Sequence, residues 1–558
     1  MESSEAPGGA GAPRADRFRQ REVEGGNRRA GPVVRMIEMS LAEVAAVTGG
    51  RLHRARGDER VTAVEFDSRA AGPGALFLAL RGERRDGHEF AAAAVAAGAA
   101  GVLAAREVDA PAVVVPPAPA DALIAGSYLA AADRDGAGAA VLAALARLAT
   151  HALEALTSPG PDGPHRPHDA AERHDDGAAG RRAAAPGPRL TVVGVTGSSG
   201  KTSTKDLLAA VLAPLGPTVA PPGSFNNELG TPWTVLRADA TTRHLVLELS
   251  ARGRGHIAAL CRIARPRVGV VLNVGSAHLR EFGSAAGIAV AKGELVEALP
   301  AAADGGVAVL NADDWRVAAM ASRTAARVVT VGRAPGADVR AEDVALDGGR
   351  ARFRLVAPQG TADVALRLVG AHHVANTLAA AAVALELGGT PDGVAAALSA
   401  AGPASRWRME VTERPDGVTV VNDAYNANPE SMRAALQALV AIAAGADPDA
   451  APRRTWAVLG PMAELGDVAG AAHAEIAAAA AALGVDELVA VGAPEYGAAV
   501  RAVGDLPAAL DLLRAELRPG DVVLLKASRA AGLDRLAAAL LEPRGPEQRG
   551  LDQREPVA

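Results

Sequence analysis

The sequence predicts an α/β protein of three domains, on two observations. Short apolar runs rich in β-branched residues alternate with Ala/Leu-rich stretches of helical spacing, which is typical of parallel sheets covered by helices. The length of 558 residues also exceeds what one hydrophobic core usually serves. We expect a small N-terminal α/β domain, a central domain built on a doubly wound parallel sheet, and a smaller, Rossmann-like α/β domain at the C-terminal side.

The chain opens with a segment, residues 1–35, that is rich in Gly, Arg, Glu and Ala and poor in large apolar residues. It cannot bury enough surface to offset its chain entropy, so we expect it to be disordered. The first domain is predicted at 36–150. Its expected elements are helices over 41–47 and 86–97, strands over 63–66 and 74–80, and a polar turn at Asp67-Ser68-Arg69.

A flexible linker is predicted at 151–189, because the stretch from Ser158 onward is rich in Pro, Gly and charged residues. It contains His165, His168 and His174. Three histidines are possible metal ligands, but their irregular spacing and the lack of a scaffold favour a solvated linker.

The second domain is predicted at 190–402, with strands over 190–195, 245–249 and 268–272. The third is predicted at 403–543. Its expected strands are short apolar runs separated by Ala/Leu-rich helices: 418–421, 456–459, 488–491 and 522–525. Residues 544–558 are polar and expected to be disordered.

Composition excludes several classes of protein. A net charge of -6 and the lack of a basic, aromatic stripe argue against nucleic-acid binding. The single cysteine, Cys261, allows no intramolecular disulfide and fits a reducing compartment; its Ala/Leu-rich setting favours packing over a nucleophilic role. We recognise no leader peptide and no run of roughly 18 strongly apolar residues, since the alanine tracts are only weakly hydrophobic. We therefore expect a cytoplasmic protein without membrane insertion.

The strongest local signal is a strand, a Gly-rich turn and a helix in direct succession, over 190–212. The turn and the first helical residues aim backbone N–H groups and the helix dipole at one point, which makes an anion site suited to phosphate. The lysine would neutralise the outer phosphates, and the threonine hydroxyl suits Mg²⁺. The candidate nucleotide-binding residues are Thr196, Gly197, Ser198, Ser199, Gly200, Lys201, Thr202 and Ser203.

This loop departs from the strict phosphate-loop pattern, because Val195 stands where a glycine is usual. The alternative is an ordinary turn followed by a surface lysine. Lysine scarcity speaks against it: Lys201, Lys205, Lys292 and Lys526 are the lysines of the whole chain, beside many arginines. An ammonium is compact and can lose its proton, so these lysines are candidates for chemistry that arginine cannot perform. We interpret the loop as an ATP site.

Polar residues follow the central strands at their carboxyl ends, where open α/β sheets bind ligands. Glu248 could hold Mg²⁺, or it could be a capping acid. His278, which follows the next strand, could be functional or merely packed. Lys292 opens an amphipathic run, and its alternatives are a snorkelling helix lysine or an amine that forms a carbamate. The loop 226–232 is dense in turn residues, and it could be functional or merely a loop.

Together these residues resemble the Mur ligases, the ATP-dependent amide-forming enzymes of peptidoglycan synthesis. The resemblance extends over 67–536 and is carried by GVTGSSGKTST, AHLREFGS, GAHHVANTLAAAA, SRWRMEV and VVNDAYNANP. It implies a P-loop ATPase as central domain, with Lys201, Glu248, His278 and Lys292 as catalytic residues. Asn226 and Asn227 would close over the phosphate loop and contact substrate.

The same resemblance assigns further roles. Asn376 would read adenine, and Arg408 and Asp423 of the third domain would clasp the nucleotide. Thr202 and Glu248 would hold one Mg²⁺, and His278 with a carbamylated Lys292 a second one. The chain departs from many relatives at His373, where asparagine is commoner.

Within the family, DAYNANPESM, GPMAELG and LKASRAAGLDRL resemble the member that adds D-alanyl-D-alanine to a UDP-N-acetylmuramoyl tripeptide. GPM replaces the commoner GDM and KAS the commoner KGS. The turn with Ser68 and Arg69 resembles that member's UDP-sugar-binding domain. Asn426, Asn428 and Ser528 are the candidate residues for the dipeptide, and the Asp-Asn-Pro-Arg motif of the diaminopimelate-adding relative is absent.

The implied reaction converts the tripeptide carboxylate to an acyl phosphate, which the dipeptide amine then attacks, in a monomer. Two alternatives remain. A sister ligase such as a folylpolyglutamate synthase is disfavoured by the first-domain turn and the NANP segment. A nucleotide-binding scaffold without catalysis is disfavoured by the set Lys201, Glu248, His278 and Lys292.

Overall fold

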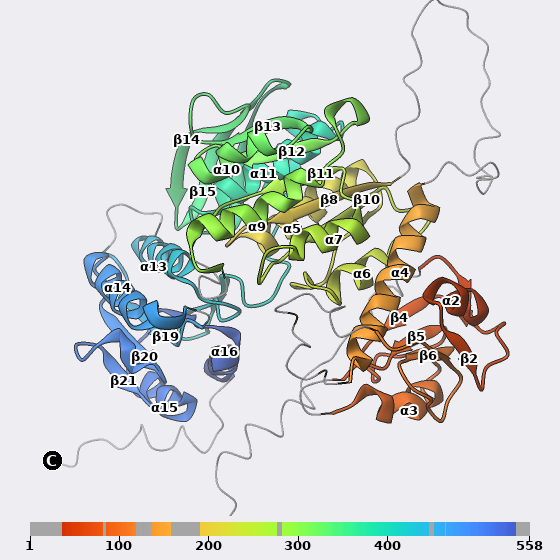
Figure 1. The fold of residues 1–558 in the computed structure, drawn as a ribbon. Helices are drawn as coiled ribbons and strands as arrows, with labels where there is room; N and C mark the ends of the chain where they lie inside the picture. Colours follow the sequence, from red (N-terminus) through yellow and green to blue (C-terminus); the bar gives the residue numbers. More distant parts are fainter. Residues whose placement is uncertain are drawn as a thin grey trace, which may run out of the picture.

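The structure is a computed structural model that describes residues 36–81, 85–118, 127, 133, 135–157, 190–275, 282–445, 451–463 and 465–542. These residues form three lobes in chain order (Figure 1). The predicted disorder of 1–35 and 544–558, the linker from 158 onward with its three histidines, and His278 lie outside the described residues.

The N-terminal lobe is a five-stranded sheet in the order β2-β7-β6-β5-β4, parallel except for β2. Within β5, Leu76 and Leu78 pack toward α2 and α4, whereas Phe77 packs toward α3. The expected elements are confirmed with small shifts at their ends, and the second helix opens with a 3₁₀ turn. The bounds are β1 Met39–Ser40, α2 Leu41–Thr48, β2 Arg51–His53, β3 Arg60–Val61, β4 Ala63–Glu65, β5 Ala75–Leu78, η1 Gly87–Phe90, α3 Ala91–Ala96, β6 Gly101–Ala104, β7 Ala112–Val114 and α4 Ala137–Thr157.

Helix α4 corrects the predicted start of the linker. Residues 151–157 continue the helix, because Ala152, Leu153 and Leu156 keep the helical spacing of buried positions. The helix packs against α2 in its own lobe and against α6 and α7 of the central lobe. Among the described helices it alone is long and apolar enough to span a membrane, but 61% of its most apolar window is buried in the fold. Such burial is what a core helix shows.

The central lobe holds a nine-stranded sheet in the order β16-β15-β14-β13-β12-β11-β8-β10-β9. Helices α7 and α9 cover one face, and α5, α11 and α12 cover the other, so the sheet is doubly wound as predicted. The bounds are β8 Thr191–Thr196, α5 Lys201–Leu212, η2 Ala213–Leu215, β9 Thr218–Val219, α6 Gly230–Val235, β10 His244–Glu248, α7 His256–Ala264, β11 Val268–Val271, α9 Ala285–Glu297, η3 Ala302–Asp304, β12 Val307–Asn311, α10 Trp315–Ala318, η4 Ala319–Arg323, β13 Arg327–Gly332, β14 Val339–Asp347, β15 Arg350–Ala357, β16 Gly360–Val369, α11 His373–Glu386 and α12 Pro391–Ala400.

The prediction of a parallel central sheet is right for β8 to β13 and wrong at one edge. There β14, β15 and β16 form an antiparallel meander. Buried and exposed residues alternate along β15, which is the pattern of a sheet with one wet face. The turn from β14 to β15 uses Gly348 and Gly349, both at positive φ, as a tight hairpin requires.

The C-terminal lobe is a six-stranded sheet in the order β17-β18-β22-β19-β20-β21, with β17 antiparallel. Helices α13 and α14 cover one face, and α15 and α16 the other. The four predicted strands are confirmed as β18, β19, β20 and β22. The bounds are β17 Glu410–Glu413, β18 Thr419–Asn422, α13 Pro429–Ala444, β19 Thr455–Leu459, η5 Gly466–Val468, α14 Ala469–Ala482, β20 Glu487–Val491, η6 Pro494–Tyr496, β21 Arg501–Val503, α15 Leu506–Glu516, β22 Val522–Lys526, η7 Arg529–Ala531 and α16 Leu533–Leu541.

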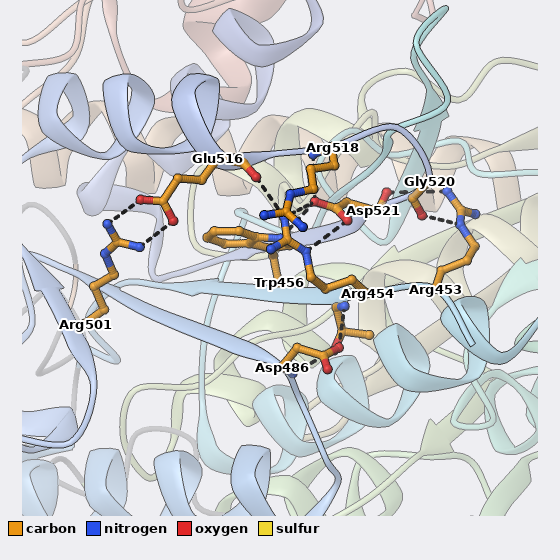
Figure 2. Close-up of polar contacts among 10 residues, drawn as sticks. Arg453, Arg454, Trp456, Asp486, Arg501, Glu516, Arg518, Gly520 and Asp521 are labelled. Carbon is orange, nitrogen blue, oxygen red and sulfur yellow. Dashed lines mark hydrogen bonds and ion pairs between the residues drawn. The ribbon is translucent and has the colours of Figure 1, made fainter. Parts of the chain in front are cut away.

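A polar network closes the amino ends of β19 and β22 (Figure 2). Asp521 accepts hydrogen bonds from Arg454 and from the indole nitrogen of Trp456, and the Arg454 guanidinium lies 4.9 Å from the Trp456 ring centroid. Because ligands bind at the carboxyl ends of such strands, this network lies at the opposite edge of the sheet from the expected site.

The N-terminal lobe is attached to the central lobe around Trp233. The Trp233 indole nitrogen donates to Val64 O at 2.8 Å, and its ring packs against Phe66 and Phe225.

Cys261 lies on α7 inside the core, where burial, with Glu294 nearby, raises the pKa of its thiol to about 12. The packing role expected for this cysteine fits these surroundings.

Candidate functional site

The phosphate loop lies at the carboxyl end of β8, between the buried strand and α5. Gly200 caps α5 in a left-handed conformation at φ 81°, and a Cβ atom there would lie 2.4 Å from Asn376 Oδ1. Glycine is thus required twice, by the backbone and by the close approach of α11. Asn273, after β11, holds the loop by accepting from Ser198 N through its carbonyl and from Ser199 N through its side chain.

Oxygen ligands gather beside this loop. The Thr202 hydroxyl donates to Glu248 Oε2 at 2.9 Å and lies 2.7 Å from Ser224 Oγ. Asn226 donates to the other Glu248 oxygen at 2.7 Å. Glu248 is only 2% exposed, and these hydrogen bonds give both of its carboxylate oxygens a partner. The structure therefore brings together Thr202, Glu248 and Asn226, which the sequence placed on separate elements.

Two lysines of the predicted set lie near each other. Lys201 Nζ donates to Gly197 O at 2.7 Å, which keeps the ammonium over the loop. Lys292, on α9, is buried, and burial together with the Lys201 charge holds the pKa of its amine well below the usual range. The described ranges contain no group of three or more Asp, Glu, His or Cys residues that could hold a metal ion.

The C-terminal lobe contributes from across the cavity. Arg408 Nη2 lies 3.1 Å from Thr202 Oγ1 and 3.2 Å from Ser224 Oγ. Within the described part of the chain, Arg408 Nε is buried without a hydrogen-bond partner. Since an unpaired buried donor is costly, this guanidinium beside the phosphate loop indicates an anionic acceptor. Asp423, at the end of β18, accepts from Lys526 Nζ at 2.6 Å.

Two histidines begin α11. The ring of His373, which departs from the commoner asparagine, lies 4.2 Å from the His372 ring, centroid to centroid. Burial, with His372 nearby, lowers the pKa of His373 well below its usual value. Asn376 follows one helical turn later and lies over Gly200.

These groups line a cavity of about 670 Å³ between the central and C-terminal lobes. Most predicted site residues line it: Ser198, Ser199, Gly200, Lys201, Thr202, Ser203, Asn226, Asn227, Glu248, Asn376, Arg408, Asp423, Asn426 and Asn428. Thr196, Gly197 and Lys292 do not line it.

Four predicted residues lie elsewhere or already have structural partners. Ser68 and Arg69 are in the N-terminal lobe, where Arg69 pairs with Asp67 and is largely exposed. Ser528 accepts from Ala463 N at 2.8 Å and does not line the cavity. Asn428 lines the cavity but also caps α13 through Ser431 N.

Sequence reasoning assigned no role to Ser224, Tyr425, Lys526 or Arg529, which line the cavity as well. Lys526 alone carried a signal, because it is one of the few lysines of the chain. The others are ordinary residues whose position depends on how the two lobes meet.

Three family models match the chain in succession: Mur ligase family, catalytic domain, over 60–150; Mur ligase middle domain, over 195–384; and Mur ligase, glutamate ligase domain, over 407–529. The chain belongs to the Mur ligase family. Its three matched regions fall in the three lobes, which confirms the predicted fold class of three α/β domains.

Full-length relatives agree with this membership. The Mur ligase is 54% identical to UDP-N-acetylmuramoyl-tripeptide--D-alanyl-D-alanine ligase of Mycobacterium tuberculosis, over 91% of this chain and 98% of the relative. It is 33% identical to the protein of the same name from Escherichia coli, over 91% of this chain and 99% of that one. MurF from Acinetobacter baumannii has a similar structure, with a TM-score of 0.72 at 29% identity, covering 91% of this chain and all of that one.

Proposed function

We propose that this Mur ligase joins D-alanyl-D-alanine to a UDP-N-acetylmuramoyl tripeptide, giving the pentapeptide precursor of peptidoglycan while ATP is converted to ADP and phosphate. The observation that carries the proposal is one cavity in which the phosphate loop, the Thr202–Glu248 pair and Arg408 converge. The high identity to full-length ligases of that name supports the choice of substrates.

The first step activates the tripeptide. A carboxylate oxygen attacks the γ-phosphorus of ATP, the bond to the bridging oxygen breaks, and ADP leaves with the acyl phosphate formed. Such a transfer requires positioning and neutralised charge more than covalent chemistry from the protein. The loop N–H groups and Lys201 hold the phosphates, and Arg408 neutralises charge from the opposite lobe.

The second step forms the amide. The free amine of D-alanyl-D-alanine attacks the acyl carbon, phosphate leaves, and the nitrogen loses a proton. Asn426 and Asn428 line the cavity on the side of the C-terminal lobe and are our candidates for holding the dipeptide. Ser68 and Arg69 remain candidates for the UDP-sugar end in the N-terminal lobe. Closure of the lobes would keep water from the acyl phosphate.

ATP and Mg²⁺ are the cofactors of the family, and the oxygen cluster fits the metal. Mg²⁺ prefers oxygen ligands and commonly takes only one or two from protein. Thr202 and Glu248 would hold one ion beside the phosphates, where Mg²⁺ supplies charge neutralisation. For the second ion we infer His278 and a carbamate on Lys292 as ligands.

The carbamate is chemically reasonable at Lys292. Burial and the nearby Lys201 charge lower the pKa of this amine, which raises its uncharged fraction, and only the uncharged amine attacks CO₂. The nitrogen forms a bond to carbon and releases one proton, which leaves an anionic group near Lys201.

We further propose that a single chain suffices and that the enzyme is cytoplasmic, in keeping with its nucleotide substrates and its single cysteine.

A substrate matrix tests the function. Purified enzyme with ATP and Mg²⁺ is given UDP-N-acetylmuramoyl tripeptide or dipeptide, each with D-alanyl-D-alanine or single amino acids, and products are identified by mass spectrometry. We expect the pentapeptide only from tripeptide plus D-alanyl-D-alanine. Products from other pairs would indicate a sister ligase, and no ADP from any pair would indicate a scaffold without catalysis.

A further inference from the structure

Two of the four lysines, Lys205 and Lys526, have no role in the reaction described above. Both are 2% exposed, which is unusual because lysine is almost never buried unless paired. They lie on different lobes, yet each is linked to one short stretch of chain, Lys205 directly at Ser405 and Lys526 through Asp423. We call residues 405–409, which lie between α12 and β17 and directly precede β17, the connecting segment.

The connecting segment has a strained backbone. Trp407 and Met409 adopt φ angles of 58° and 49°, although neither is glycine. Side chains disfavour this left-handed region, and such conformations persist only where surrounding contacts enforce them. The residue between these two positions is Arg408.

The central lobe holds one end of the segment. Lys205 Nζ pairs with Asp206, donates to Pro221 O at 2.9 Å, and lies 3.4 Å from Ser405 Oγ. Asp206 Oδ2 in turn accepts from the backbone nitrogen of Ser405 at 3.1 Å. One lysine–aspartate pair thus binds both the side chain and the backbone of Ser405.

The C-terminal lobe holds the other end in the same way. Lys526 Nζ donates to Asp423 Oδ2 at 2.6 Å and to Asn426 O at 2.8 Å. Asp423 Oδ1 accepts from the backbone nitrogen of Met409 at 3.2 Å. A second buried lysine–aspartate pair therefore fixes the second strained residue.

Aromatic contacts complete the arrangement. The Arg529 guanidinium lies 3.8 Å from the Trp407 ring centroid, and the Arg408 guanidinium lies 4.0 Å from that of Tyr425. Arg408 then reaches Thr202 and Ser224 at the phosphate loop. A compact ammonium can serve a carboxylate and a carbonyl at once in a confined space, which a planar guanidinium cannot do in the same way.

We propose that Lys205 and Lys526 are positioning residues: their aspartate pairs fix both ends of the connecting segment and so hold Arg408 over the phosphate loop. The inference rests on the proposed function only in taking a nucleotide as the ligand of this cavity. It also explains why lysine is kept at two positions in a chain that otherwise uses arginine.

A double-mutant cycle on nucleotide affinity tests the proposal. Binding of ADP with Mg²⁺ is measured by calorimetry for Lys205→Met and Lys526→Met, each with Arg408 present and with Arg408→Ala. We expect each lysine variant to weaken ADP binding by about tenfold when Arg408 is present and by less than about twofold when it is absent. Equal weakening in both backgrounds would overturn the proposal, because the lysines would then act without Arg408.

The control is Arg454→Met, which removes a partly buried ion pair of the same lobe at the opposite edge of the sheet (Figure 2). It should lower the melting temperature and leave ADP affinity unchanged. If Lys205→Met or Lys526→Met fails to fold, the arginine variant of that lysine takes its place in the cycle. We again expect weaker ADP binding only when Arg408 is present. Wild-type protein that binds no ADP would overturn the proposed function and, with it, this inference.

Discussion

At the scale of single residues, Lys292 shows how burial changes chemistry. The amine lies within the central core, and desolvation and the Lys201 charge both lower its pKa. A depressed lysine pKa means that the unfolded state binds more protons than the native state, at every pH between the two pKa values. Stability contributed by this group therefore rises with pH across that window, up to the usual lysine range.

The Lys292→Met variant should reveal that cost in buffer free of CO₂. At pH 7 we expect its melting temperature to exceed that of the wild type by about 2–4 °C, because no amine need be desolvated. The difference should shrink as the pH approaches 10, where the unfolded amine also loses its proton. Scanning calorimetry over this pH range measures it, and a difference independent of pH would contradict the lowered pKa.

The same residue gives a prediction about activity. Lys292→Arg replaces the amine with a guanidinium that cannot form a carbamate, so we expect kcat to fall by at least about 100-fold. Lys292→Ala should regain part of its activity with added acetate or formate, since a small carboxylate can take the place of the carbamate. The carbamate hypothesis fails if Lys292→Arg retains wild-type turnover.

At the scale of elements, the phosphate loop depends on the close approach of α11. In Gly200→Ala the added Cβ atom would be strained by the positive φ and would clash with the Asn376 side-chain oxygen. We expect ADP affinity to fall by about tenfold or more, because the loop must shift away from its phosphate-binding conformation.

The matched control for Gly200→Ala is Gly49→Ala, at φ 65° with no atom within 4 Å of the added Cβ. It imposes a similar backbone strain in the N-terminal lobe, away from the nucleotide site, and should lower the free energy of unfolding by about 1–2 kcal/mol. ADP affinity should not change. If both variants lower the affinity equally, general destabilisation rather than the loop is responsible.

Several elements could be predicted because their signals are local. Continuous apolar runs identified β8, β10 and β11. Because Thr202 and Glu248 follow the carboxyl ends of neighbouring strands, the sequence indicated that they would meet. The meander of β14 to β16 was not predicted, because β15 alternates between buried and exposed residues and lacks the continuous apolar run that marks a fully buried strand. The linker was predicted to begin at residue 151, which is too early, because the helical spacing of α4 continues past Thr150.

At the scale of the whole molecule, the site depends on contacts between lobes. Arg408 lies 206 positions from Thr202 along the chain, and no local pattern shows that they touch. The family resemblance assigned a nucleotide role to Asp423, but nothing in the sequence predicted that Asp423 pairs with Lys526. Such contacts follow from how the lobes are arranged, which a single sequence does not reveal.

The attachment of the N-terminal lobe can be tested at Trp233. This ring is 5% exposed and joins β4 to α6 through Val64 O. Trp233→Ala should cost about 3–5 kcal/mol and separate an early unfolding transition in calorimetry. Trp315→Ala, at a residue that is 70% exposed, should leave the profile unchanged. A Trp233→Ala profile identical to that of the wild type would show that the lobes are coupled elsewhere.

The most direct test of the interdomain site is isotope transfer. The UDP-N-acetylmuramoyl tripeptide is prepared with ¹⁸O in its reacting carboxylate and turned over with ATP and D-alanyl-D-alanine. Activation by phosphoryl transfer predicts that each released phosphate carries one carboxylate oxygen, because the acyl phosphate breaks at the acyl carbon. Phosphate that carries no ¹⁸O would mean that the cavity hydrolyses ATP with water, and the acyl-phosphate mechanism would be wrong.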